Sequence, residues 1–80
     1  MTREEAFERL TKVFQDVFDD NTIEIGETTT ADDIEEWDSF EHINLVVAVE
    51  EEFGFKIPMG KTVTMKNVGE MVDLILERGK

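Results

Sequence analysis

A chain of 80 residues is long enough for one small domain, covering residues 1–80, with a core of limited size. Its net charge of −12 argues against a nucleic-acid-binding role, which depends on clustered Lys and Arg, and the absence of cysteine excludes disulfides and thiolate metal sites. The longest apolar run, Leu45–Val49, is too short to span a membrane, and the acidic, amphipathic N-terminus is unlike a secretory or mitochondrial leader, so we expect a soluble, cytoplasmic protein.

The charged residues are unevenly distributed along the chain. From Val13 to Phe55 there are fourteen Asp or Glu side chains and no Lys or Arg, whereas all basic residues lie nearer the two ends. This distribution predicts a negative surface that attracts basic partners.

The first helix is predicted to begin after Thr2, a capping residue with Glu5 at the boxed position. Apolar side chains at helical spacing predict its buried face: Phe7, Leu10, Phe14 and Val17, widened by Ala6, Val13 and Phe18. The polar residues Asp19, Asp20 and Asn21 are expected to end the helix.

A long loop is predicted over residues 20–36, which show no sustained periodicity. We expect Ile23, Ile25 and Ile34 to hold this loop against the core. A calcium loop of the EF-hand type is rejected, because starting it at Asp19 or Asn21 puts Ile23 at a ligand position.

A second helix is predicted from Ser39 to Phe53, capped by Asp38 with Glu41 returning a bond, and stopped by Gly54. The Ser39 hydroxyl would lie beside unpaired backbone N–H groups at the positive end of the helix, where a phosphate group is favoured. One buried face is predicted from the apolar spacing: Phe40, Ile43, Val46, Val47 and Phe53.

The remainder predicts an extended segment at residues 55–58, a turn or short helical fragment at 59–63, and a last helix capped by Thr64. Met65, Val68, Met71, Val72 and Ile75 would share one face of that helix, and Gly79 would close it. The predicted fold class is therefore all-α: a small up-down helical bundle of three main helices plus a short one, with a long first loop.

Catalysis is poorly supported by these residues, so no enzyme is predicted. Ser39 and His42 lie three residues apart and could be neighbours on a helix, but nothing in the sequence indicates an oxyanion hole or a pocket. We interpret His42 as a partly exposed helix residue or a contact for a partner.

One stretch resembles the acyl carrier proteins: Trp37-Asp38-Ser39-Phe40, then Ile43, Leu45–Val49, the run Glu50-Glu51-Glu52-Phe53-Gly54, and Ile57-Pro58. The resemblance implies a four-helix bundle in which Ser39 carries 4′-phosphopantetheine, attached from coenzyme A by a separate phosphopantetheinyl transferase. It implies that Asp38 helps to position the incoming cofactor. The chain would carry an acyl or aminoacyl group as a thioester on this arm and pass it between enzymes.

The same resemblance implies which surface the partners read. The implied contact residues are Phe40, Glu41, His42, Val47, Glu50 and Glu51, and the implied partners are acyl-activating, synthase or acyltransferase enzymes with basic patches. The carrier is expected to be a monomer.

Several residues depart from the general fatty-acid type: Trp37, Phe40 in place of Leu, His42 in place of a small residue, and Asn44 in place of a carboxylate. These departures suggest a specialised free-standing carrier, for instance from a polysaccharide or secondary-metabolite (polyketide) pathway, at least as strongly as one for fatty acid biosynthesis. An alternative stays open, namely an acidic interaction module that binds a basic partner and is never modified.

Overall fold

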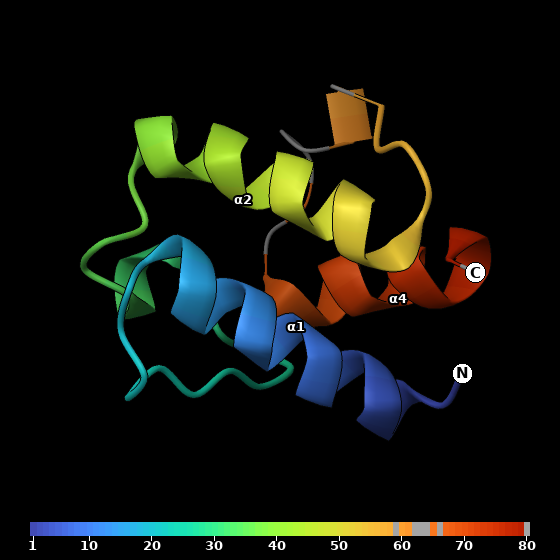
Figure 1. Ribbon diagram of the computed structural model, residues 1–80, viewed down its shortest axis with the longest axis horizontal. Coiled ribbons are helices and arrows are strands. Elements are labelled where there is room, and N and C mark those ends of the chain that lie inside the picture. Colours follow the sequence, from blue (N-terminus) through green and yellow to red (C-terminus); the bar gives the residue numbers. More distant parts are fainter. Residues whose placement is uncertain (59, 62–64, 66, 80) are drawn as a thin grey trace.

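The computed structural model describes residues 1–58, 60–61, 65 and 67–79. Its helices are α1 (Arg3–Val17), the 3-10 turn η1 (Ala31–Asp33), α2 (Ser39–Phe53) and α4 (Val68–Arg78), and no strand occurs among these described residues. Helices α1 and α2 lie side by side and run in opposite directions, and α4 packs against α1 (Figure 1). The predicted all-α bundle with its long first loop is confirmed.

Helix α1 begins and packs as its sequence predicts. The Thr2 hydroxyl accepts a hydrogen bond from the Glu5 N–H at 3.1 Å and so caps the first turn. Its fully buried positions include Leu10 and Phe14, at the centre of the core. The helix ends at Val17, and Asp19 has a positive φ of 51°.

Helix α2 has the predicted bounds but presents a different face to the core. Leu45, Val49 and Phe53 are buried, whereas three of the five residues predicted to be buried are exposed: Phe40 (81%), Ile43 (65%) and Val47 (47%). Val46 is only partly buried. The predicted face was wrong because α2 is apolar on more than one side, so two stripes at helical spacing compete and periodicity alone does not decide between them.

Helix α4 begins later than predicted. Its cap is Asn67, whose side-chain oxygen accepts from the Glu70 N–H at 3.0 Å, so Met65 precedes the helix instead of lying in its first turn. The predicted cap Thr64, like residues 59, 62 and 63 of the predicted short fragment, lies outside the described residues, although residues 60 and 61 are helical. The predicted closure is confirmed, because the Gly79 N–H donates to the Ile75 carbonyl at 2.6 Å.

The loop between α1 and α2 is held from both sides. Ile23 and Ile34 are buried and Ile25 is partly buried, as predicted. The first N–H groups of α4 donate to loop carbonyls. The Val68 N–H donates to the Thr29 carbonyl at 2.8 Å, and the Gly69 N–H donates to the Glu27 carbonyl at 3.0 Å. The loop thus supplies acceptors for backbone donors that a helix start cannot satisfy itself.

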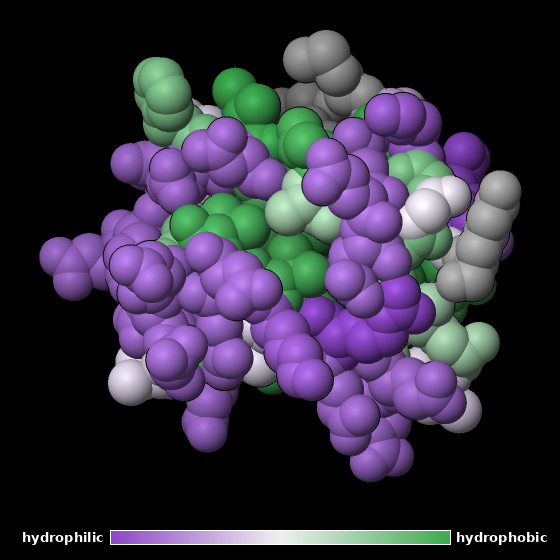
Figure 2. Space-filling model, in the orientation of Figure 1, coloured by the Kyte–Doolittle hydropathy of each residue, from purple (hydrophilic) through white to green (hydrophobic). Residues whose placement is uncertain are grey.

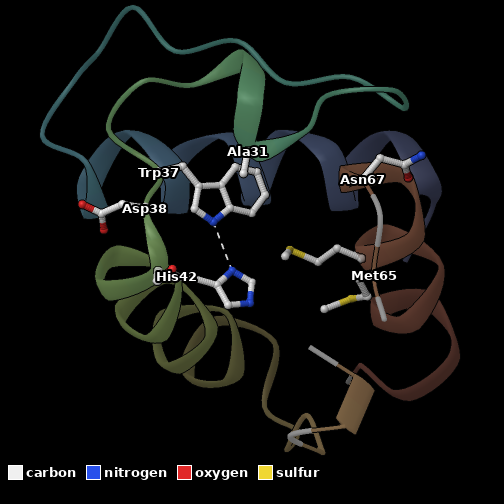
Figure 3. Close-up of a pocket in the computed structure, with 8 residues that line it drawn as sticks. Ala31, Trp37, Asp38, His42, Met65 and Asn67 are labelled. Carbon is white, nitrogen blue, oxygen red and sulfur yellow. Dashed lines mark hydrogen bonds between the residues drawn. The ribbon is translucent and has the colours of Figure 1, made fainter. Parts of the chain in front are cut away.

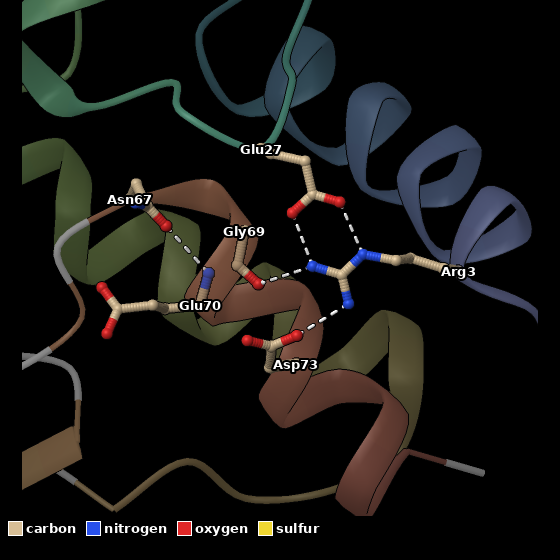
Figure 4. A network of polar contacts seen from close by, with 6 residues as sticks. All are labelled: Arg3, Glu27, Asn67, Gly69, Glu70 and Asp73. Carbon is tan, nitrogen blue, oxygen red and sulfur yellow. Dashed lines mark hydrogen bonds and ion pairs between the residues drawn. The ribbon is translucent and has the colours of Figure 1, made fainter.

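Arg3 joins three parts of the chain (Figure 4). Its guanidinium donates twice to the Glu27 carboxylate, at 2.6 Å each, and once to Asp73 at 2.7 Å. A fourth hydrogen bond from Arg3 reaches the Gly69 carbonyl at 3.3 Å. The hydrogen bonds from Arg3 hold the pKa of Glu27 below its ordinary value.

Among the described residues, no helix combines the length and apolar character that crossing a membrane requires.

Candidate functional site

Ser39 is the first residue of α2, and its side chain is exposed. The first bond within the helix runs from the His42 N–H to the Asp38 carbonyl at 2.9 Å. The N–H groups of Ser39, Phe40 and Glu41 therefore have no acceptor within the helix. Of these three groups, the Asp38 carboxylate accepts a hydrogen bond only from the Glu41 N–H, at 2.8 Å. The Ser39 hydroxyl thus lies beside open donors at the positive end of the helix dipole, as predicted.

The predicted return bond from Glu41 to the cap is absent. The Glu41 carboxylate accepts from the Asn44 amide at 3.2 Å, and the Asp38 N–H donates to the Glu36 carbonyl at 3.1 Å. The capping-box prediction was wrong here because both groups have other partners nearby, but the Asp38 cap itself is confirmed.

Two rings fix the chain on either side of Ser39. The Trp37 Nε1–H donates to His42 Nδ1 at 3.0 Å, and the two ring planes are nearly parallel, with 15° between them and 6.0 Å between centroids. Trp37 also meets Phe14 of α1 edge to face, at 5.2 Å. These contacts anchor the start of α2 on the core while leaving Ser39 outside it.

A pocket of about 450 Å³ opens beside Ser39 (Figure 3). Trp37 and His42 line one side of it, and Met65 and Asn67 line the opposite side. Its lining consists of Ala31, Trp37, Asp38, Ser39, His42, Met65, Asn67 and Met71, drawn from η1, α2, α4 and the segments that lead into the helices. The sequence indicated no pocket here, because its residues come from parts of the chain that are far apart in sequence: the long loop, the start of α2, and α4 with the residues just before it.

The hydrolase interpretation gains nothing from this pocket. His42 Nδ1 accepts from Trp37, and the described contacts include no hydrogen bond between the side chains of Ser39 and His42. A nucleophile and its base need such a contact. Nor does any group of three or more His, Asp or Glu in the described part of the chain have the arrangement to hold a metal ion.

An apolar stripe of exposed residues follows Ser39 along α2: Phe40, Ile43 and Val47. Figure 2 shows hydrophobic residues along the upper edge of the view, where α2 lies. All three were predicted to lie on the buried face; Phe40 and Val47 were also implied as partner contacts by the family resemblance, whereas Ile43 was not. The signal for it was its spacing of three and four residues from the other two, which places all three on one side of a helix.

The predicted acidic contacts differ in what their carboxylates already bind. Glu50 accepts from the Ile57 N–H at 2.6 Å, and therefore helps to hold the segment after α2. Glu52, which was not among the predicted contacts, pairs with Arg9 of α1 at 2.8 Å. Glu51 lies between them and is exposed. Of the three neighbours, Glu51 is thus the one whose carboxylate is directed to solvent without a described partner.

Comparisons with known proteins agree with this geometry. The family model described as "Phosphopantetheine attachment site" matches residues 8–75. An acyl carrier protein of Acidothermus cellulolyticus is 31% identical over 94% of this chain and 89% of its own length. A solution structure of a holo acyl carrier protein from Geobacter metallireducens superposes with a TM-score of 0.84 at 39% identity, covering 90% of this chain and 83% of the other.

Proposed function

The chain belongs to the acyl carrier protein family, and from this premise we propose that Ser39 carries its 4′-phosphopantetheine arm. The predicted family and its covalent phosphopantetheine cofactor are confirmed by the matches to the family model and to a holo carrier. Proteins of this family are carriers and not enzymes. The observation that carries the proposal is the exposed Ser39 hydroxyl at the first position of α2, directly after the Asp38 cap.

The local chemistry supports this assignment. In the proposed reaction the Ser39 oxygen forms a bond to the phosphorus next to pantetheine in coenzyme A, the pyrophosphate bond breaks, and the nucleotide leaves. The hydroxyl proton passes to a base of a separate phosphopantetheinyl transferase. The open N–H groups at the start of α2 favour the negative phosphodiester that results. The thiol at the end of the arm supplies the reactive group that this cysteine-free chain lacks.

The partner surface we propose is the exposed side of α2. It combines the apolar stripe of Phe40, Ile43 and Val47 with the acidic residues Glu41, Glu50 and Glu51, and His42 lies at its start. Because no Lys or Arg occurs between Val13 and Phe55, this side attracts basic patches and speeds encounter more than it tightens the complex. The partners of this surface are the transferase and the acyl-activating, synthase or acyltransferase enzymes that load and unload the arm.

Residues 1–80 would then work as one carrier domain, free-standing and specialised in its cargo. Support for specialisation comes from residues around the site: Trp37, Phe40, His42 and Asn44 differ from the general fatty-acid type. Two of them, Trp37 and His42, also line the pocket beside the attachment residue.

Intact-mass analysis tests the attachment residue. Incubated with coenzyme A and an active phosphopantetheinyl transferase, the protein should gain the mass of one phosphopantetheinyl group, and Ser39→Ala should gain none. Thr28→Ala, which removes another exposed hydroxyl, is the matched control and should gain the group normally. Modification of Ser39→Ala would overturn the assignment. No gain in any variant under an active transferase would favour the unmodified interaction module.

A further inference from the structure

The hydrogen bond between Trp37 and His42 determines which imidazole nitrogen is available to a ligand. Because His42 Nδ1 accepts the indole N–H at 3.0 Å, it carries no proton, and the proton of the neutral ring is on Nε2. In Figure 3 the imidazole extends from α2 toward the side of the pocket where Met65 lies. His42 therefore presents an N–H donor within the pocket, close to the attachment residue.

The rest of the pocket lining is largely apolar. Among the described lining residues, the indole of Trp37 and the side chains of Met65 and Met71 are the large apolar groups. Asn67 lies on the side opposite Trp37, and its oxygen is already engaged with the Glu70 N–H. The pocket thus offers apolar surface for a compact branched group and a His42 donor for an oxygen beside that group.

The position of Ser39 determines which part of a group attached to it can enter the pocket. Ser39 itself lines the pocket, so the atoms that come first after the phosphate lie at its mouth. In 4′-phosphopantetheine these atoms form the pantoyl unit: a carbon with two methyl groups, then a hydroxyl and an amide carbonyl. The thiol and its cargo lie at the far end of the arm and reach the pocket only if the arm folds back.

We propose that this pocket is a resting site for the pantoyl unit of the arm, with the two methyl groups against Trp37 and the methionines. The His42 Nε2–H donates to the pantoyl hydroxyl or amide oxygen. Trp37 is a positioning residue in this site, because its bond to Nδ1 orients the ring and fixes the tautomer. The proposal depends on the assignment of the arm to Ser39, and its test separates the two.

Nuclear Overhauser measurements on the loaded protein test the resting site. The single tryptophan and single histidine of the chain give unique ring signals. We expect cross-peaks between the two pantoyl methyl groups and the Trp37 indole protons, and a shift of the indole N–H signal on loading. Absence of both in a protein whose mass shows the arm would overturn the resting site and leave the attachment intact. A protein that gains no mass would overturn the attachment.

His42→Phe is the informative variant, because it keeps an aromatic ring against Trp37 and removes the donor. We expect the methyl cross-peaks to weaken, because the loss of one net hydrogen bond lowers the ratio of docked to free arm by a factor of about 2 to 10. Thr28→Ala, in the exposed part of the long loop and not part of the pocket lining, is the control and should leave them unchanged. Unchanged cross-peaks in His42→Phe would overturn the donor role. Met65→Ala, which shortens an apolar side chain of the pocket wall, should also weaken the methyl cross-peaks. Thermal unfolding of each variant, followed by circular dichroism, shows that a loss of cross-peaks does not come from unfolding.

Discussion

Asp38 combines a structural role that the structure shows with a chemical role that we propose. Its carboxylate accepts from the Glu41 N–H at 2.8 Å and caps α2. Next to Ser39, it is also the residue that we propose helps to position the incoming cofactor on the transferase. Asn caps helices about as well as Asp but has no charge, so a single substitution separates the roles.

We expect Asp38→Asn to leave the free energy of unfolding nearly unchanged and to slow the addition of the arm. Asp38→Ala should lower the free energy of unfolding by about 1 kcal/mol, because the cap is lost, and should slow the addition as well. Urea unfolding gives the stability, and a time course of intact mass gives the rate. If Asp38→Asn is modified as fast as the unsubstituted protein, the charge has no part in the reaction.

At the scale of helices, the sequence predicted those features that neighbouring residues determine. Thr2 and Asp38 cap α1 and α2, and Gly54, in the left-handed conformation with φ of 72°, ends α2 as predicted. The face of α2 was not predictable in this way. Which of its two apolar stripes meets α1 depends on how the two helices dock, and that is a property of the whole fold.

The start of α4 and the role of Glu50 illustrate the same limit. Asn67 caps α4 at a point where the loop carbonyls meet its first N–H groups, and only the fold brings that loop there. Glu50 looks like one of three equivalent surface carboxylates, but the chain returns after Gly54 and places the Ile57 N–H against it. The positions of Ser39 and Asp38 at the start of α2 were predicted correctly, whereas the pocket beside them was not predicted.

A pair of alanine substitutions tests the corrected face of α2. Ile43 is 65% exposed and Leu45 is fully buried, although the two are similar in size and lie two residues apart. Ile43→Ala should change the free energy of unfolding by no more than about 0.5 kcal/mol. Leu45→Ala should lower it by about 2–5 kcal/mol, because it leaves a cavity in the core. Urea unfolding of both variants measures this, and equal losses would contradict the observed packing.

At the scale of the whole molecule, Arg3 holds segments that are far apart in sequence. Its partners Glu27 and Asp73 lie 24 and 70 residues away, one in the long loop and the other on α4. No local pattern marks such a pairing, and it was not predicted. The loop and α4 both contribute residues to the pocket beside Ser39. By bonding to both of them, Arg3 at the start of α1 helps to hold these two parts of the pocket in place.

The contribution of this contact to stability depends on pH in a known direction. The Arg3 hydrogen bonds lower the pKa of Glu27 in the folded protein below its ordinary value of 4.5. A lowered pKa means that the folded state favours the charged form, so the stabilisation is fully present above pH 4.5. It is lost as the pH falls from there through the lowered pKa. The pair is partly exposed, so its effect is modest and weakens with salt.

Protonation of the other carboxylates complicates a simple acid titration, because it also relieves the repulsion within a chain of net charge −12. Two variants that remove the same charge from the same loop cancel this effect: Glu27→Gln, which loses the charged partner of Arg3, and Glu24→Gln, which does not touch it. We expect Glu27→Gln to be the less stable of the two at pH 7, with the difference shrinking as the pH falls below 4.5. Thermal unfolding at a series of pH values measures this difference. A difference that stays constant across the series would show that the charge of Glu27 does not carry the stabilisation.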